Sequence, residues 1–127
     1  MTPPPVPPRK TGLAHLLAAT RYSLQGARRL WHEAAFRHEV LAAALVLPAL
    51  ALLGAPLWAL AVQAVLVLIL IATEALNTAI EELVDHLTAD WAAFAANAKD
   101  LGSLAVMCLL LANGVWLATV LWLALSG

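Results

Sequence analysis

Three long apolar stretches dominate the chain, and each is long enough to form a membrane-spanning helix. Between Val40 and Thr73 there is no Asp, Glu, Lys, Arg or His. A helix needs about 20 apolar residues to cross the hydrocarbon core of a bilayer. The pattern predicts spans over residues 33–53, 57–86 and 100–125. The expected fold class is therefore an all-α integral membrane protein.

The sequences between these stretches predict where the spans end. Gly54-Ala55-Pro56 is a turn sequence that carries no Lys or Arg, as expected of a loop outside the cell. Residues 87–98 form the second connection. Asn97, followed by Asp100, resembles a helix N-cap with its reciprocal acid, so we expect the last span to begin there.

Residues 12–31 have the pattern of an amphipathic helix that lies on a membrane surface. At 100° per residue, one set of mostly apolar side chains falls within a sector of about 100°. The set comprises Leu13, Leu16, Leu17, Thr20, Leu24, Ala27 and Trp31. Arg21 and Arg28 flank this sector, which suits the cytoplasmic headgroup layer. The preceding residues 1–11 are rich in proline and predict a disordered or extended tail.

Composition and charge agree with a small membrane protein. Of 127 residues, 63% are hydrophobic and 12% are charged, whereas a soluble domain has about a quarter charged residues. We expect one membrane domain over residues 12–127. Six of the seven Lys and Arg residues precede the first apolar run, and Lys99 is the seventh. The positive-inside rule then places the N-terminus in the cytoplasm and, after three spans, the C-terminus outside.

A strip of polar side chains marks the cytoplasmic end of the second predicted span. Its members are Glu74, Asn77, Glu81 and Asp85. On a helix these four side chains share an arc of roughly 80°. Glu82 points off the arc, toward solvent. Glu74 is the deepest member, and acids at the edge of the hydrocarbon layer are rare and usually functional. The strip therefore predicts a membrane enzyme rather than a passive span.

The acidic strip also predicts a site for a divalent cation and a nucleotide. Carboxylates on one face repel one another unless a cation lies between them. Mg²⁺ binds one or two carboxylates and completes its shell with water and phosphate oxygens. Three further acids lie at predicted cytoplasmic helix ends: Glu33, Glu39 and Asp100. Together with the positive charge of Lys99, these groups are enough to hold the polyphosphate of ATP with Mg²⁺. The sequence has no Gly-rich phosphate loop and no nucleic-acid-binding pattern.

Several motifs of this chain occur together in one known family. Residues 74–81 read Glu-Ala-Leu-Asn-Thr-Ala-Ile-Glu, and residues 98–103 read Ala-Lys-Asp-Leu-Gly-Ser. Residues 31–39 read Trp-His-Glu-Ala-Ala-Phe-Arg-His-Glu, and Tyr22-Ser23 precedes Gly26. Together they resemble the signature of the bacterial integral-membrane diacylglycerol kinases. The similarity covers nearly everything except the proline-rich tail.

The resemblance implies an enzyme of the bacterial cytoplasmic (inner) membrane that transfers the γ-phosphate of MgATP to the hydroxyl of diacylglycerol, giving phosphatidic acid. It implies a homotrimer of three-span subunits, with active sites shared between neighbours. Cofactor Mg²⁺ and the substrates ATP and diacylglycerol follow from the same resemblance.

Individual roles are implied by motif position. Glu74 corresponds to the general base, and Asn77 and Ser103 to groups that position the reacting lipid hydroxyl. Glu33 and Glu81 correspond to the metal ligands, and Lys99 to a catalytic cation. The implied ATP contacts are Tyr22, Glu33, Glu81, Asp85, Lys99 and Asp100.

The chain differs from the family pattern at two places near the nucleotide. His15 stands where the family often has an Arg that contacts ATP. The chain is also one residue shorter between Trp31 and Glu33, which would rotate the surface helix and Tyr22 relative to Glu33.

Three other functions stay open on the sequence. An undecaprenol kinase would share the signature, although the Glu-Ala-Ala-Phe-Arg segment favours diacylglycerol. A small subunit that conducts protons through Glu74 and Glu81 is the second alternative, but between Val40 and Thr73 only Gln63 and Thr73 are polar. A purely structural membrane spacer is the third, and it leaves the acidic strip unexplained.

Overall fold

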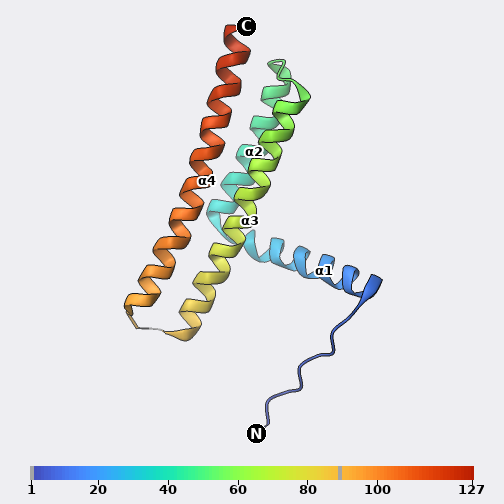
Figure 1. Ribbon diagram of the computed structural model, residues 1–127, viewed down its shortest axis with the longest axis vertical. Helices are drawn as coiled ribbons and strands as arrows, with labels where there is room; N and C mark the ends of the chain where they lie inside the picture. Colours follow the sequence, from blue (N-terminus) through green and yellow to red (C-terminus); the bar gives the residue numbers. More distant parts are fainter. Residues whose placement is uncertain (1, 89) are drawn as a thin grey trace.

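The computed structural model describes residues 2–88 and 90–127, and this part of the chain contains four helices (Figure 1). They are α1 (Gly12–Leu30), α2 (Ala34–Leu52), α3 (Leu57–Leu87) and α4 (Ala93–Ser126). By length and composition, α2, α3 and α4 are each able to cross a membrane. The prediction of three apolar helices of that kind is therefore confirmed. Residues 2–11 carry no helix or strand.

The helix α3 is the central element, because it contacts each of the other three helices. The long helices α2 and α4 run alongside it, whereas α1 leads away from the bundle at a steep angle (Figure 1). Since α2 is the shortest of the three long helices, it covers only the half of α3 near the α2–α3 turn. The acidic half of α3 is flanked by α4 and by the end of α1.

A small core closes the bundle at the end where α2 turns into α3. One residue from each long helix is buried there: Leu50, Ala59 and Val120. The indole nitrogen Nε1 of Trp116 donates a hydrogen bond to the backbone oxygen of Ala59 at 3.2 Å. The turn itself depends on Gly54, whose φ of +88° is strained for any residue with a side chain. The turn predicted at residues 54–56 is therefore confirmed.

A polar pair joins α3 to α4 inside the apolar region. Gln63 Nε2 donates to Asn113 Oδ1 at 3.0 Å. Asn113 Nδ2 in turn donates to the backbone oxygens of Leu66 on α3 and Leu109 on α4, at 3.2 and 2.8 Å. Hydrogen bonds of this kind hold membrane helices together. The pair sets the register of α4 along α3, and with it the register of the side chains at the acidic end.

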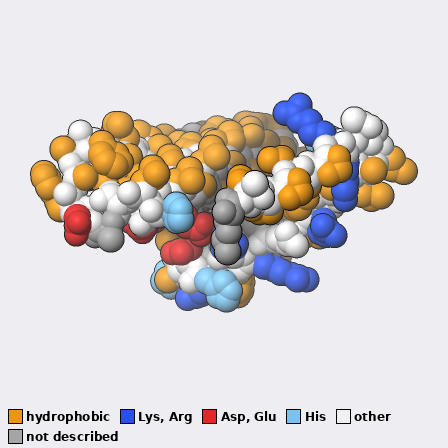
Figure 2. Space-filling view, turned by 90° about the horizontal axis from the view of Figure 1, so that it is seen from below, with side chains coloured by type: hydrophobic (Ala, Val, Ile, Leu, Met, Phe, Trp, Pro, Cys, Tyr) orange, Lys and Arg blue, Asp and Glu red, His pale blue; other side chains and the backbone are white. Residues whose placement is uncertain are grey.

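Most large apolar side chains of the three long helices are exposed in the isolated chain. Figure 2 shows the molecule from below, with hydrophobic side chains over much of its surface and acidic side chains gathered in small areas. A surface of this kind is stable only where acyl chains or neighbouring helices cover it.

The start of α4 differs from the sequence prediction. The helix begins at Ala93, and its N-cap is Ala92 rather than Asn97. The predicted pairing of Asn97 with Asp100 as a helix cap is therefore wrong. Residues 93–98 contain four alanines, the best helix former, so the helix extends through this segment. As a result, Lys99 and Asp100 project from inside a helix and are held at fixed positions beside α3.

Candidate active site

Glu74 is the buried acid of the strip on α3. It is 8% exposed, and the Glu39 side chain on α2 lies within hydrogen-bonding reach of its carboxyl group. One carboxyl oxygen of Glu39, Oε2, is buried and has no hydrogen-bond partner. Two carboxyl groups this close repel each other unless a proton or a cation lies between them. The Glu39–Glu74 pair is therefore where the site most needs a positive charge.

Asn77 and Glu81 form the next level of the strip, toward the acidic end of α3. Asn77 Nδ2 donates to Glu81 Oε1 at 3.3 Å, and both residues are half-buried. Gly102 on α4 packs directly against the other side of the Asn77 amide. A methyl group at Gly102 would overlap Asn77 Oδ1 and lie 3.2 Å from its Cγ. The close approach of the α4 backbone thus holds the Asn77 side chain in place.

An ion pair between α3 and α4 closes the exposed end of the strip. Lys99 Nζ lies 2.7 Å from Asp85 Oδ1, with both side chains partly exposed. Lys99 also lies near enough to Glu81 to be attracted by its charge. The positive charge predicted for this layer is thus next to two members of the strip. Asp100 and Ser103 follow on α4, and both are exposed.

Glu33 lies at the start of α2. It is the N-cap residue of that helix and is exposed. The turn that carries it is tied by Arg37, whose Nη1 donates to the backbone oxygen of Trp31 at 2.7 Å. Within the described residues, no group of three or more His, Cys, Asp or Glu side chains could hold a metal ion. In the described part of the chain, Glu33 and Glu81 are therefore not members of a metal-binding group of three or more such side chains.

His15 and Tyr22 lie on α1, on the side that faces the tail. They share a cavity of about 270 Å³ with Pro7, Pro8, Arg9 and Lys10. The guanidinium carbon of Arg21 lies 5.8 Å from the centre of the Tyr22 ring. Among the described residues, no hydrogen bond or ion pair joins His15 or Tyr22 to the acids of α3. The predicted site residues thus lie in three places: one group on α3 and α4, His15 and Tyr22 on α1, and Glu33 at the start of α2.

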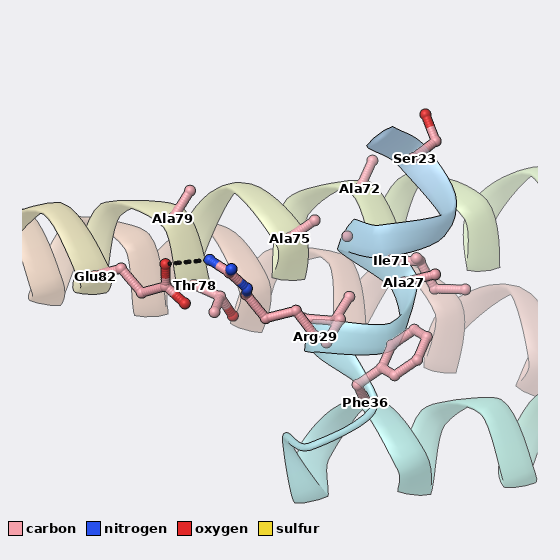
Figure 3. A pocket seen from close by; sticks show the side chains of 12 residues that line it. Ser23, Ala27, Arg29, Phe36, Ile71, Ala72, Ala75, Thr78, Ala79 and Glu82 are labelled. Atoms are coloured by element: carbon pink, nitrogen blue, oxygen red, sulfur yellow. Dashed lines mark hydrogen bonds and ion pairs between the residues drawn. The ribbon is translucent and has the colours of Figure 1, made fainter. Parts of the chain in front are cut away.

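A crevice of about 450 Å³ separates α1 from α3, and Figure 3 shows its lining. At its rim, Arg29 Nη1 lies 3.1 Å from Glu82 Oε2. Glu82 is exposed, and its side chain reaches Arg29 of α1 (Figure 3). The inner wall is built of small side chains that include Ala72, Ala75 and Ala79. The Arg29–Glu82 contact escapes sequence reasoning because it depends on the angle at which α1 leaves the bundle.

The donor set of the strip suits a hard cation rather than a soft one. All its charged ligand atoms are carboxylate oxygens, and one of the neighbouring oxygens, Glu39 Oε2, is buried without a partner. Mg²⁺ binds through one or two carboxylates together with phosphate oxygens and water, so it does not need a complete protein cage. The residues present are therefore compatible with a magnesium–nucleotide complex.

Comparison with known proteins identifies the family. The model of the prokaryotic diacylglycerol kinase family matches residues 21–121. A diacylglycerol kinase from a Sinorhizobium species is 49% identical over 112 residues, which cover 88% of this chain and 82% of that protein. The diacylglycerol kinase of Haemophilus influenzae is 36% identical over 108 residues, covering 84% of this chain and 92% of that protein. The diacylglycerol kinase of Escherichia coli K12 is 31% identical over 113 residues, which cover 88% of this chain and 93% of that protein. The chain therefore belongs to the prokaryotic diacylglycerol kinase family.

Proposed function

We propose that this protein transfers the γ-phosphate of ATP to the free hydroxyl of diacylglycerol, giving phosphatidic acid, with Mg²⁺ as cofactor. The observation that carries the proposal is the gradient of burial along α3. Glu74 is buried beside Glu39, whereas Asp85 is exposed and paired with Lys99. A lipid hydroxyl approaches from the apolar side and a nucleotide from the aqueous side, so the two substrates would meet between these two levels.

Glu74 is the proposed general base. The lipid oxygen forms a bond to the γ-phosphorus while the bond between that phosphorus and the ADP oxygen breaks. The hydroxyl proton passes to the Glu74 carboxylate, and ADP leaves with the electron pair of the broken bond. A base placed in this way contributes about 10²–10⁴-fold to a reaction rate. Glu39, as its hydrogen-bonding neighbour, would hold the Glu74 carboxyl group in position.

The next level of the strip would orient the reacting groups. Asn77 would orient the hydroxyl through its amide, with Ser103 as a second positioning group. Glu81 and Glu33 would hold Mg²⁺, which supplies neutralisation of the phosphate charge that develops during transfer. Lys99 would stabilise the same charge.

The exposed residues would hold the nucleotide. Asp85 pairs with Lys99 at the open end of the strip, and the exposed Asp100 follows Lys99 on α4. Tyr22, and His15 in the place of a family Arg, would contact ATP from α1. To reach a phosphate, Lys99 would break its ion pair with Asp85 and pair with the nucleotide instead. The partial exposure of both side chains allows this change of partner.

A homotrimer with shared sites is part of the proposal. Among the described residues, no hydrogen bond or ion pair joins Glu33 or Tyr22 to the acids of α3, whereas the proposed chemistry uses all of them. A neighbouring subunit could supply the missing group. The exposed apolar side chains of all three long helices provide surface for such an assembly.

The protein is proposed to lie in the bacterial cytoplasmic membrane as a multi-pass protein, with α1 on the cytoplasmic surface. The basic residues of the tail and α1 support this orientation, because Lys and Arg are concentrated on the cytoplasmic side of membrane proteins. ATP is available on that side, where the acidic end of α3 would then lie.

The test is phosphorylation of lipid by the purified protein in mixed micelles. The protein is incubated with labelled ATP and either diacylglycerol or undecaprenol, with Mg²⁺ present or removed by chelation. We expect labelled phosphatidic acid only when Mg²⁺ is present. Labelling of undecaprenol alone would show that the acceptor is a polyprenol. Transport of protons by the protein in vesicles without ATP consumption would contradict a kinase altogether.

A further inference from the structure

The tail and α1 meet at a bend, and a cavity lies between the two segments. The bend is at Gly12, the first residue of α1, whose φ of +64° lies in the left-handed region that residues with a side chain rarely adopt. Residues 2–11 leave α1 at an angle there (Figure 1). The cavity has a volume of about 270 Å³. At about 30 Å³ for each water molecule in the liquid, it holds about nine waters or a short chain of phosphate groups.

The lining of this cavity offers positive charge and hydrogen-bond donors, but no carboxylate. Arg9 and Lys10 come from the tail, and His15 and Tyr22 come from α1. Each of these four side chains can donate a hydrogen bond, and two of them are permanent cations at neutral pH. The rest of the lining is made of proline and alanine, namely Pro7, Pro8, Ala18 and Ala19. A cavity with this chemistry suits an oxyanion such as phosphate.

The positive charge around the bend is not neutralised by nearby acids of the chain. Residues 1–32 contain no Asp or Glu, but they contain five cations: Arg9, Lys10, Arg21, Arg28 and Arg29. Among the residues that the structure describes, Arg29 is the only one of these five that pairs with an acid. The start of α1 adds to the charge, because Thr11 makes no side-chain capping bond and the first turn contains no acid. The bend therefore attracts a negatively charged ligand.

The position of the cavity on α1 indicates where that ligand comes from. At 100° per residue, the α1 residues of the lining are centred roughly 160° around the helix from the apolar sector that contains Leu16 and Leu24. In the proposed orientation the apolar sector faces the lipid, so the cavity faces the cytosol. A soluble phosphate compound reaches it directly, whereas a lipid headgroup lies on the other side of the helix.

We propose that this cavity binds phosphate groups of the nucleotide, with Arg9 and Lys10 of the tail as ligands. The inference rests on the proposed function and adds the tail to the nucleotide site. Tyr22 and Arg29 are seven residues apart, so they share one face of α1 at a separation of about 10 Å. Arg29 contacts Glu82 on the acidic half of α3. A nucleotide held at the bend is therefore on the side of α1 that faces the acids of α3.

The test is the KM for ATP in neutral-detergent micelles that contain saturating dioctanoylglycerol. Arg9→Gln and Lys10→Gln should each raise this KM by roughly two- to fivefold, the range expected of exposed charge pairs. The double variant should raise it by about tenfold, because separate contacts add. The kcat and the KM for the lipid should not change, since neither side chain touches the reacting atoms. Calorimetric titration with ATP should show the same loss of affinity.

The matched control is Arg28→Gln, which removes one positive charge from α1 at a position outside the cavity lining. It should leave the KM for ATP unchanged. An equal rise in Arg28→Gln would mean that only the overall charge of the segment matters, and the cavity would not be the site.

A second variant tests the shape of the bend while both cations are retained. Gly12→Ala places a side chain where φ is positive, so the tail should turn away from α1 and the KM for ATP should rise severalfold. An unchanged KM would show that the direction of the tail does not matter, and it would overturn the proposal.

Two further outcomes separate the possible errors. If the double variant differs from the unaltered protein only when phosphatidylglycerol is added to the micelles, the ligand is a lipid headgroup and the proposal is wrong. If the unaltered protein phosphorylates no diacylglycerol, the proposed function fails. If it is active but the double variant keeps its KM and its calorimetric affinity for ATP, only the role of the tail fails.

Discussion

The contact between Gly102 and Asn77 allows a sharp test of the site, through the addition of a single methyl group. In Gly102→Ala, the new Cβ would overlap Asn77 Oδ1 and crowd its Cγ at 3.2 Å and Cβ at 3.8 Å. All three atoms belong to a side chain, so the amide can rotate away without separating the helices. In doing so it gives up the hydrogen bond from Nδ2 to Glu81 Oε1, which is 3.3 Å long.

The loss can be estimated from that one hydrogen bond. Hydrogen bonds to charged groups contribute about 1.5–3 kcal/mol. At about 1.4 kcal/mol for each factor of ten, kcat should fall by roughly 10- to 150-fold. The unfolding free energy should fall by less than this, because Ala favours a helix over Gly by up to about 1 kcal/mol and so offsets part of the cost.

The assay is the phosphorylation of dioctanoylglycerol at saturating ATP, with a thermal unfolding scan of the same samples. Gly114→Ala is the matched control, since it makes the same substitution in the same helix where nothing lies within 4 Å of the new Cβ. It should keep full activity with this short-chain lipid.

A double-mutant cycle then asks whether Gly102 acts through Asn77. Asn77→Ala alone should lose about as much activity as Gly102→Ala, and the combined variant should lose little more, because both changes remove one interaction. If the two losses multiply, or if Gly102→Ala is fully active, the methyl group does not act by displacing Asn77 and the reasoning is refuted.

Three further predictions concern individual side chains. Glu74→Gln should lower kcat by about 10²–10⁴-fold while nucleotide binding, measured by calorimetry, is retained; normal turnover would disprove the base assignment. Glu81→Gln should abolish activity at every Mg²⁺ concentration tested. The same substitution at its exposed neighbour, Glu82→Gln, should lower activity only slightly, and an inactive Glu82→Gln variant would contradict the observed orientation of the strip. Arg29→Gln removes an exposed ion pair, so the unfolding free energy should fall by at most about 1 kcal/mol, and a large loss of stability would mean that this contact holds α1 in place.

The predicted helices agree well with the structure because each depends on a local pattern. The apolar runs on either side of Gly54 and Pro56 yield α2 and α3 with ends within a residue or two of those expected. The start of α4 was misplaced, since a plausible capping pair at Asn97 and Asp100 lies within an alanine-rich segment that is itself helical.

The strip on α3 was also predictable, because its members are on a single helix and need only the helical period. The side chains that other helices place beside the strip were not predictable from the sequence. Glu39 could be named as a nearby acid, but its place beside Glu74 depends on how α2 packs on α3. The bonding of Gln63 to Asn113 joins positions 50 residues apart and leaves no signal in the local sequence.

The brevity of the α2–α3 connection constrains how the protein enters its bilayer. Between Leu52 and Leu57 the chain has four residues, which span at most about 14 Å when fully extended. The hydrocarbon layer is about 30 Å thick, so this loop can never bridge it with one helix on each side. The two helices must cross together as a hairpin during biosynthesis. The carboxamide of Gln63 therefore enters the lipid as part of this hairpin, before Asn113 on α4 emerges to pair with it.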